Sequence, residues 1–121
     1  MIQVKDETIE RCIKFRDDRN WKQFHNPKDL ALSISLEANE LLELYQWKNG
    51  DEIMAVDRKR VAEELSDVML YCISFADRMG FDLDEILNMK MDMNQEKYPV
   101  ELASGSKEKY DELRRRAEKK A

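Results

Sequence analysis

One segment restricts the folds open to this chain more than any other. Residues 27–48 form a predicted helix with apolar side chains on nearly all of its sides, at Leu30, Ala31, Leu32, Ile34, Leu36, Ala38, Leu41, Leu42, Leu44, Tyr45 and Trp47. A helix of this kind must be covered on every side. A chain of 121 residues has too few other helices to do so. The segment therefore predicts a homo-oligomer in which further copies of the chain complete the core.

Local sequence signals place both ends of this helix and indicate another helix before it. Asn26 and Pro27 provide an N-cap and a proline in the first turn. The pair Asn49-Gly50 is expected to end the helix. Apolar residues also recur at helical spacing in the N-terminal segment, which predicts a first helix over residues 5–19.

Further signals divide the second half of the sequence. Asp51 can cap a short helical piece, after which a third helix is expected to run to Met79 and to end at Gly80. Asp82 has the position of a capping-box residue and opens a fourth helix. That helix should end before Pro99, because the residue that precedes a proline resists the α conformation.

The composition agrees with a purely helical fold. The chain has 3 Gly and 2 Pro, too few turn residues for the hairpins of a β protein. We therefore expect an all-α, four-helix bundle in one domain over residues 1–103, completed by oligomerisation. Residues 104–121 are expected to form a charged, partly flexible C-terminal tail that includes a helix from Lys107 onward.

Charge and cysteine usage exclude several classes of function. The net charge of −5 disfavours a nucleic-acid partner, and Arg114-Arg115-Arg116 is expected to be a solvated stripe. No apolar run reaches the roughly 18 residues of a membrane span, and the N-terminus lacks the pattern of a signal peptide. Cys12 and Cys72 have neither metal-binding nor disulfide spacing, so a cytoplasmic location is expected, with Cys72 as a small buried apolar residue.

Four acidic residues stand out because of where they lie. Glu37 and Glu40 are three residues apart on the most apolar helix, and Glu64 and Asp67 repeat this spacing among the apolar residues of the next. Two such helices packed face to face would gather four carboxylates around one point.

Four buried anions at one point need a compensating cation. Burying them costs several kcal/mol per charge, and hard oxygen ligands select Mg²⁺ or Mn²⁺. Water on such an ion can attack a phosphate ester or anhydride. The spacing alone is equally compatible with solvent-facing charge stripes. A di-iron site would require Glu-x-x-His motifs, and the single histidine, His25, lies outside the helices.

At these residues the sequence resembles a known family. Glu37-x-x-Glu40, a gap of 23 residues and Glu64-x-x-Asp67 resemble the signature of the MazG-like, all-α nucleoside triphosphate pyrophosphohydrolases. The flanking sequence is similar to the dCTP pyrophosphatase-like branch of that family in Trp21-Lys22-Gln23-Phe24-His25, Glu43-Leu44-Tyr45-Gln46-Trp47-Lys48, Glu63-Glu64-Leu65-Ser66-Asp67-Val68 and Lys97-Tyr98-Pro99-Val100. The similarity extends from about Ile9 to Tyr110.

The resemblance implies an activity and a set of ligands. It implies hydrolysis of a (deoxy)nucleoside triphosphate, dCTP-like in the first instance, to the monophosphate and pyrophosphate. It also implies Mg²⁺ on the four carboxylates and a homotetramer, a dimer of dimers, whose sites lie between subunits. The residues expected at the nucleoside pocket are Trp21, Trp47 and Asn94, and those expected near the phosphates are Lys97 and Tyr98.

Three further positions belong to this hypothesis. His25 is expected to line the pocket, and Glu37 and Glu40 are the leading candidates for the general base. Family members have histidine where this chain has Cys12, on the side that contacts the base, so Cys12 bears on the preferred base.

Residue chemistry alone leaves other roles open. The two tryptophans can fill a core, Asn94 can end a helix and Lys97 can be solvated. Two rival functions also remain at this point. One is a non-catalytic helical module that docks a partner protein through its apolar helix. The other is an all-α dUTPase-like diphosphatase, which would accept dUDP.

Overall fold

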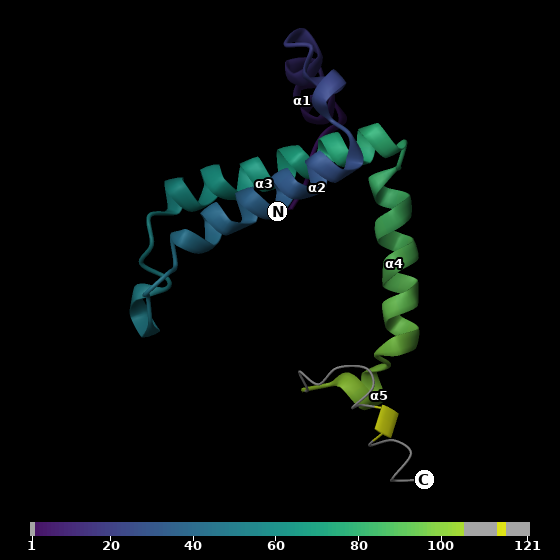
Figure 1. The fold of residues 1–121 in the computed structure, drawn as a ribbon. Coiled ribbons are helices and arrows are strands. Elements are labelled where there is room, and N and C mark those ends of the chain that lie inside the picture. The colour runs from purple at the N-terminus through teal and green to yellow at the C-terminus, as the bar shows by residue number, and fades with distance from the viewer. Residues whose placement is uncertain (1, 106–113, 116–121) are drawn as a thin grey trace. The chain divides into compact units, whose positions relative to one another are not determined.

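The protein is all-α. The computed structural model describes residues 2–105 and 114–115, and within these ranges it contains helices and turns but no strand (Figure 1). In chain order the elements are α1 (Asp6–Asp18), η1 (Trp21–Phe24), α2 (Pro27–Glu43), η2 (Gly50–Glu52), α3 (Arg58–Met79), α4 (Leu83–Lys97) and α5 (Val100–Ala103). The all-α expectation is confirmed. Most of the expected C-terminal tail and its helix lie outside the described residues.

Local capping interactions fix three of the predicted helix ends. The Asn26 side chain accepts a hydrogen bond from the backbone N–H of Asp29 at 2.8 Å. Gly80 adopts a left-handed conformation with φ of 70°, and the N–H of the following residue donates to the carbonyl of Ala76 at 2.8 Å, which closes α3 in a Schellman motif. The Asp82 side chain then accepts from the N–H of Glu85 at 3.2 Å and begins α4.

The connection between α2 and α3 differs from the expectation. The predicted second helix ran to Lys48, whereas α2 ends at Glu43. The reason is a change in hydrogen bonding: the N–H groups of Leu44 and Tyr45 donate three residues back, and Trp47 then takes a left-handed φ of 67°. Asn49, not Asp51, occupies the N-cap position of η2.

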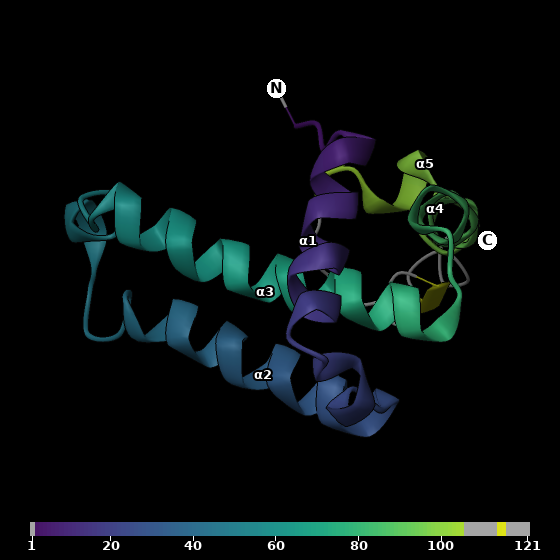
Figure 2. The ribbon, with the colours of Figure 1, turned by 90° about the horizontal axis from the view of Figure 1, so that it is seen from above.

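The described chain divides into two compact units, Met1–Phe81 and Asp82–Ala121, which are described separately. In the first unit, α2 and α3 lie side by side and antiparallel, and α1 crosses α3 (Figures 1 and 2). This pair of long helices gives the unit its shape. It also brings the α2 and α3 acidic residues to facing positions.

The first unit has very little interior. Among the described residues the buried apolar side chains are Leu30, Ile73 and Ala76. Several large side chains of α2 are more than half exposed, namely Leu32, Leu36 and Leu42. The structure therefore leaves α2 apolar and uncovered along much of its length, as the sequence pattern predicted for a single copy. Cys72 is half-buried rather than fully buried, and burial raises the pKa of its thiol.

The second unit consists of α4, the short α5 and the described residues beyond it. The α4 helix ends at Lys97, before Pro99, as predicted. An Nη2 of Arg114 donates to the carbonyl of Glu96 at 3.3 Å. Within the described ranges of the whole chain, no helix has the length and apolar character that crossing a membrane requires.

A buried arginine joins α1 to α3. Arg16 is 3% exposed, and its guanidinium lies 2.9 Å from an oxygen of Asp17 and 2.8 Å from an oxygen of Asp77. Burial by itself would lower the pKa of Arg16, but the hydrogen bonds and negative charges of the two aspartates raise it. The guanidinium is therefore fully charged and depends on both carboxylates.

This ion pair gives a stability prediction. Asp77→Asn should lower the free energy of unfolding by about 2 kcal/mol, because it leaves a buried cation with one carboxylate fewer. Asp18→Asn is the matched control, since it removes one carboxylate from the exposed Lys14–Asp18 pair and should cost less than about 1 kcal/mol. Urea unfolding measures both. Equal losses in the two variants would contradict the structural role given to Arg16.

Candidate functional site

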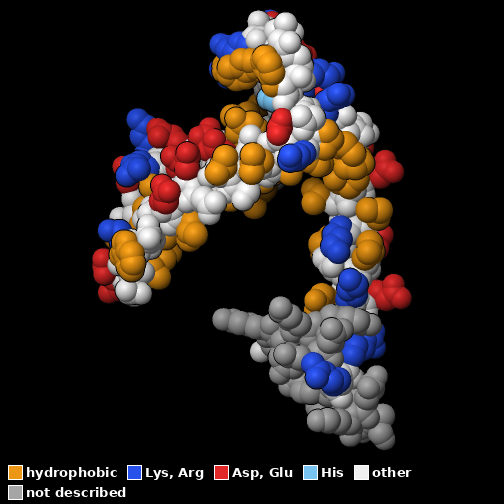
Figure 3. Space-filling model, in the orientation of Figure 1, with side chains coloured by type: hydrophobic (Ala, Val, Ile, Leu, Met, Phe, Trp, Pro, Cys, Tyr) orange, Lys and Arg blue, Asp and Glu red, His pale blue; other side chains and the backbone are white. Residues whose placement is uncertain are grey.

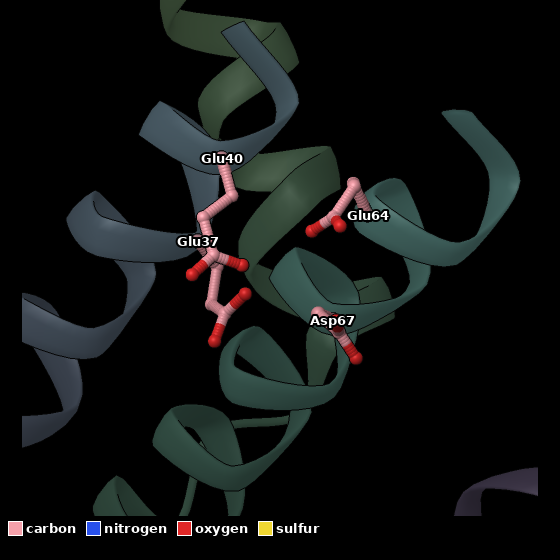
Figure 4. A group of neighbouring side chains, drawn as sticks. All are labelled: Glu37, Glu40, Glu64 and Asp67. Carbon is pink, nitrogen blue, oxygen red and sulfur yellow. The ribbon is translucent and has the colours of Figure 1, made fainter. Parts of the chain in front are cut away.

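Four carboxylates converge between α2 and α3. Glu37 and Glu40 extend from α2 toward Glu64 and Asp67 of α3 (Figure 4). One oxygen of each residue lies within 4.8 Å of the chosen oxygens of the other three. The convergence follows from the sequence, because each pair is spaced three residues apart and the two helices pack antiparallel. The four side chains do not diverge into solvent as separate charge stripes would.

The environment of the cluster is partly desolvated. Glu37, Glu64 and Asp67 are half-buried, whereas Glu40 is exposed. The Oε2 atoms of Glu37 and Glu64 are buried and have no hydrogen-bond partner. No lysine or arginine within the described ranges forms an ion pair with any member of the cluster. Two buried acceptor atoms therefore lack a donor, which is costly unless a cation binds there.

The carboxyl groups also alter one another's protonation. The pKa of Glu37 is raised, first by burial and then by the nearby carboxyl group of Glu40 and the negative charges of Asp67 and Glu64. Burial also raises the pKa of Glu64, as do Glu40 and Asp67, while the positive charge of Arg60 acts in the opposite direction. Burial and mutual repulsion both disfavour the charged forms of these groups, so a cation that bound among them would be stabilised.

The donor set fits a hard divalent ion. It consists only of carboxylate oxygens, the ligands that Mg²⁺ and Mn²⁺ prefer, and the two orphaned oxygens offer coordinating lone pairs. Because Glu40 is exposed, one side of the cluster remains open to water and to a phosphate ligand.

An aromatic pocket adjoins the cluster on one side. It has a volume of about 280 Å³, and Glu37 and Asp67 form its edge nearest the carboxylates. Two residues predicted for nucleoside binding, Trp21 and His25, line it together with Cys12. The Trp21 ring meets the ring of Phe15 edge to face, with centroids 5.7 Å apart. Flat aromatic faces beside polar groups suit a planar heterocycle.

The surroundings of His25 in this pocket favour the neutral form of its side chain. Burial lowers the pKa of its imidazole, and the positive charge of Arg16 lowers it further. Its Nδ1 atom is buried without a hydrogen-bond partner, and its backbone carbonyl accepts a bond from Arg78 at 3.1 Å. The unpartnered nitrogen is therefore available to a ligand in the pocket.

Trp47 lies apart from the residues of the aromatic pocket. It is 85% exposed and follows α2, whereas Trp21 precedes α2. The 17 residues of α2 separate the two ends by about 25 Å. One chain therefore does not bring its two tryptophans to the same ligand.

The remaining predicted site residues belong to the second unit. Asn94, Lys97 and Tyr98 lie at the C-terminal end of α4, where the Tyr98 N–H donates to the carbonyl of Asn94 at 2.8 Å. Asn94 is half-buried, and the other two are exposed. Their participation in the site stays a prediction.

Sequence reasoning missed five residues of the aromatic pocket, namely Phe15, Arg16, Leu70, Tyr71 and Ser74. Tyr71 could have been found, because it is four residues after Asp67 and therefore on the same face of α3. Phe15 is one of the apolar residues that recur at helical spacing in the N-terminal segment. Its place beside Trp21, like that of Arg16, depends on how α1 crosses α3, which no local pattern encodes.

Comparisons with known proteins show which family and which proteins the chain resembles. A family model described as MazG-like matches residues 32–113. The chain is 41% identical over 115 residues to dCTP pyrophosphatase 1 of Mus musculus, covering 90% of this chain and 68% of the relative. For the Homo sapiens protein of the same name the identity is 41% over 113 residues, with 88% and 66% covered. The crystal structure of a pyrophosphatase from Archaeoglobus fulgidus superposes with a TM-score of 0.73 at 34% identity, covering 82% of this chain and 99% of that one.

The crowded carboxylates give a second prediction. Glu37→Gln should stabilise the metal-free protein by about 1 kcal/mol, because it removes one of four mutually repelling charges. Thermal unfolding in a chelator at fixed protein concentration measures the change. Glu63→Gln is the matched control, an exposed neighbour outside the cluster whose effect should stay within about 0.5 kcal/mol. A Glu37→Gln protein no more stable than this control would refute the repulsion.

Proposed function

The chain belongs to the MazG-like family, and on that premise we propose a divalent-metal-dependent nucleoside triphosphate pyrophosphohydrolase that converts dCTP or a close analogue to the monophosphate and pyrophosphate. The relatives support pyrophosphohydrolase activity on nucleoside triphosphates. The observation that carries the metal dependence is the convergence of four carboxylates with two orphaned buried oxygens. A role in cleansing the nucleotide pool follows from such an activity.

Glu37, Glu40, Glu64 and Asp67 would hold the ion, with Mg²⁺ proposed first and Mn²⁺ as a substitute. When bound by these residues, a divalent ion would lower the pKa of bound water and would screen the charge of the phosphates. Glu37 or Glu40 accepts the proton of the attacking water. As the water oxygen bonds to the α-phosphorus, the bond from that phosphorus to the bridging oxygen breaks and pyrophosphate leaves.

The nucleoside is proposed to bind in the aromatic pocket. The Trp21 ring would stack on the base, and the unpartnered Nδ1 of neutral His25 would bind a polar edge of the nucleoside. The preference for a dCTP-like substrate comes from the names of the relatives. Asn94, Lys97 and Tyr98 are proposed to contact the sugar and the phosphates.

A homo-oligomer, proposed as a tetramer, would complete both the core and the site. The exposed apolar side chains of α2 need a cover that the described chain does not provide. Because Trp47 and Trp21 lie at opposite ends of α2, a partner copy would have to bring its Trp47 to the pocket of the first.

The activity has a direct test. Purified protein with Mg²⁺ should release pyrophosphate from dCTP, and Glu37→Ala or Asp67→Ala should abolish turnover while the helical circular dichroism persists. Glu63→Ala is the matched control and should retain activity. A panel of triphosphates and dUDP in the same assay identifies the preferred base and separates the dUTPase-like alternative. Unchanged turnover in the cluster variants would reject these residues as ligands.

Subunit complementation tests the shared site. Trp47→Ala and Glu37→Gln proteins should each be inactive, and refolding them together at equal amounts should restore about a quarter of wild-type activity. Half of the randomly paired dimers contain one copy of each variant. Each of these dimers has two sites, and in one of them an intact carboxylate cluster meets an intact Trp47 from the other copy. A mixture of Glu37→Gln with Asp67→Asn is the control and should stay inactive, because both residues belong to one chain's cluster. No recovery in the first mixture, or a monomer at micromolar concentration, would overturn the shared site.

A further inference from the structure

A second pocket adjoins the carboxylate cluster on the side away from the aromatic pocket. It has a volume of about 660 Å³ and lies where α2 ends and α3 begins. Glu40 and Glu64 form its edge at the cluster, just as Glu37 and Asp67 form the edge of the aromatic pocket. The four carboxylates therefore lie between two pockets, and each pocket is lined by two of them.

The sequence of α3 connects these pockets along one helix face. Arg60, Glu64, Asp67 and Tyr71 are spaced four, three and four residues apart, so they form one stripe. The stripe begins in the second pocket, passes through the cluster and ends in the aromatic pocket. Arg60 and Asp67 are separated by about 10 Å along the helix axis. A nucleotide with its base near Tyr71 can thus place its terminal phosphates near Arg60.

The second pocket combines two basic side chains with four carboxylates, two of which belong to the cluster, so a polyphosphate would bind there together with the divalent ion. Lys48 and Arg60 line the pocket, and within the described part of the chain neither side chain forms a hydrogen bond or an ion pair. Glu43 and Asp57 line it as well, but the Asp57 side chain accepts the N–H of Lys59 at 3.0 Å and caps α3. The two cations are thus free to bind an anion. Figure 3 shows basic side chains beside the acidic ones at this end of the α2–α3 pair.

Arg60 lies one helical turn before Glu64 on α3, and both residues line the second pocket. The Arg60 side chain is therefore on the same side of α3 as the carboxylates, where it can contact a phosphate that binds beside them. Its planar donor group suits phosphate oxygens.

We propose that Lys48 and Arg60 form a pyrophosphate subsite, which binds the β- and γ-phosphates of the substrate and then the pyrophosphate product. The subsite rests on the proposed function and adds the orientation of the substrate. The base lies toward Trp21, in the aromatic pocket, and the leaving pyrophosphate lies toward Lys48, in the second pocket. The aromatic pocket has no comparable pair of free cations among its described lining residues, because Arg16 is bound to Asp17 and Asp77.

The test is a binding measurement that needs no turnover. Titration calorimetry of the full chain with inorganic pyrophosphate and Mg²⁺ should show binding, which Arg60→Gln and Lys48→Gln should each weaken roughly tenfold or more, the loss expected for one charge-assisted contact. Lys59→Gln is the matched control. It removes the same charge from the residue next to Arg60 but lies outside the pocket, and should leave the affinity unchanged.

The outcomes are distinct. Equal affinity of wild type and Arg60→Gln for pyrophosphate overturns the subsite. An equal loss of affinity in Arg60→Gln and Lys59→Gln also overturns it, because the loss would then come from the overall positive charge of this region and not from a contact with Arg60. Absence of pyrophosphate binding to wild type overturns it too. In an active enzyme, Arg60→Gln should relieve inhibition by pyrophosphate but not inhibition by the nucleoside monophosphate. Pyrophosphate binding that depends on Arg60, in a protein that hydrolyses no triphosphate, would uphold the subsite and reject the proposed function.

Discussion

Repulsion among four carboxylates is the constraint around which the first unit is built. Two antiparallel helices hold these groups within 4.8 Å of one another, partly shielded from water and without a basic partner in ion-pair contact among the described residues. Such an arrangement lowers the stability of the chain by itself, because like charges in a poorly hydrated gap repel strongly. The stability that the site lacks must come from elsewhere, which links the chemistry of the cluster to the packing of the helices that hold it.

That packing is thin in a single copy. Three small or medium apolar side chains are buried among the described residues, and the buried Arg16 joins α1 to α3 through aspartates rather than through a large apolar contact. The exposed leucines of α2 and the position of Trp47 apart from the aromatic pocket both support the proposed oligomer. In it, further copies would cover the apolar helix and bring a second aromatic ring to the pocket.

Local sequence signals were sufficient for much of the fold and for the centre of the site. The Asn26 and Asp82 caps and the Gly80 terminator depend on interactions between residues a few positions apart, and they appear as predicted. The convergence of the acidic residues needed only helical spacing and one antiparallel pairing. Phe15 and Arg16 could not be assigned, because their neighbours come from another helix at a crossing angle that the spacing does not specify. The early end of α2 could not be predicted, because the N–H groups of Leu44 and Tyr45 bond to carbonyls three residues back instead of four. The apolar side chains that follow Glu43 continue the helical pattern past this point and conceal the change.

The backbone at Trp47 has one more consequence. A φ of 67° suits glycine or asparagine, and a side chain as large as an indole pays about 1 kcal/mol to adopt it. A glycine at this position would adopt the same φ without that cost. The tryptophan therefore costs the loop some conformational free energy, while its side chain remains 85% exposed in a single copy. In the proposed oligomer, contacts of this ring with a further copy would offset that cost.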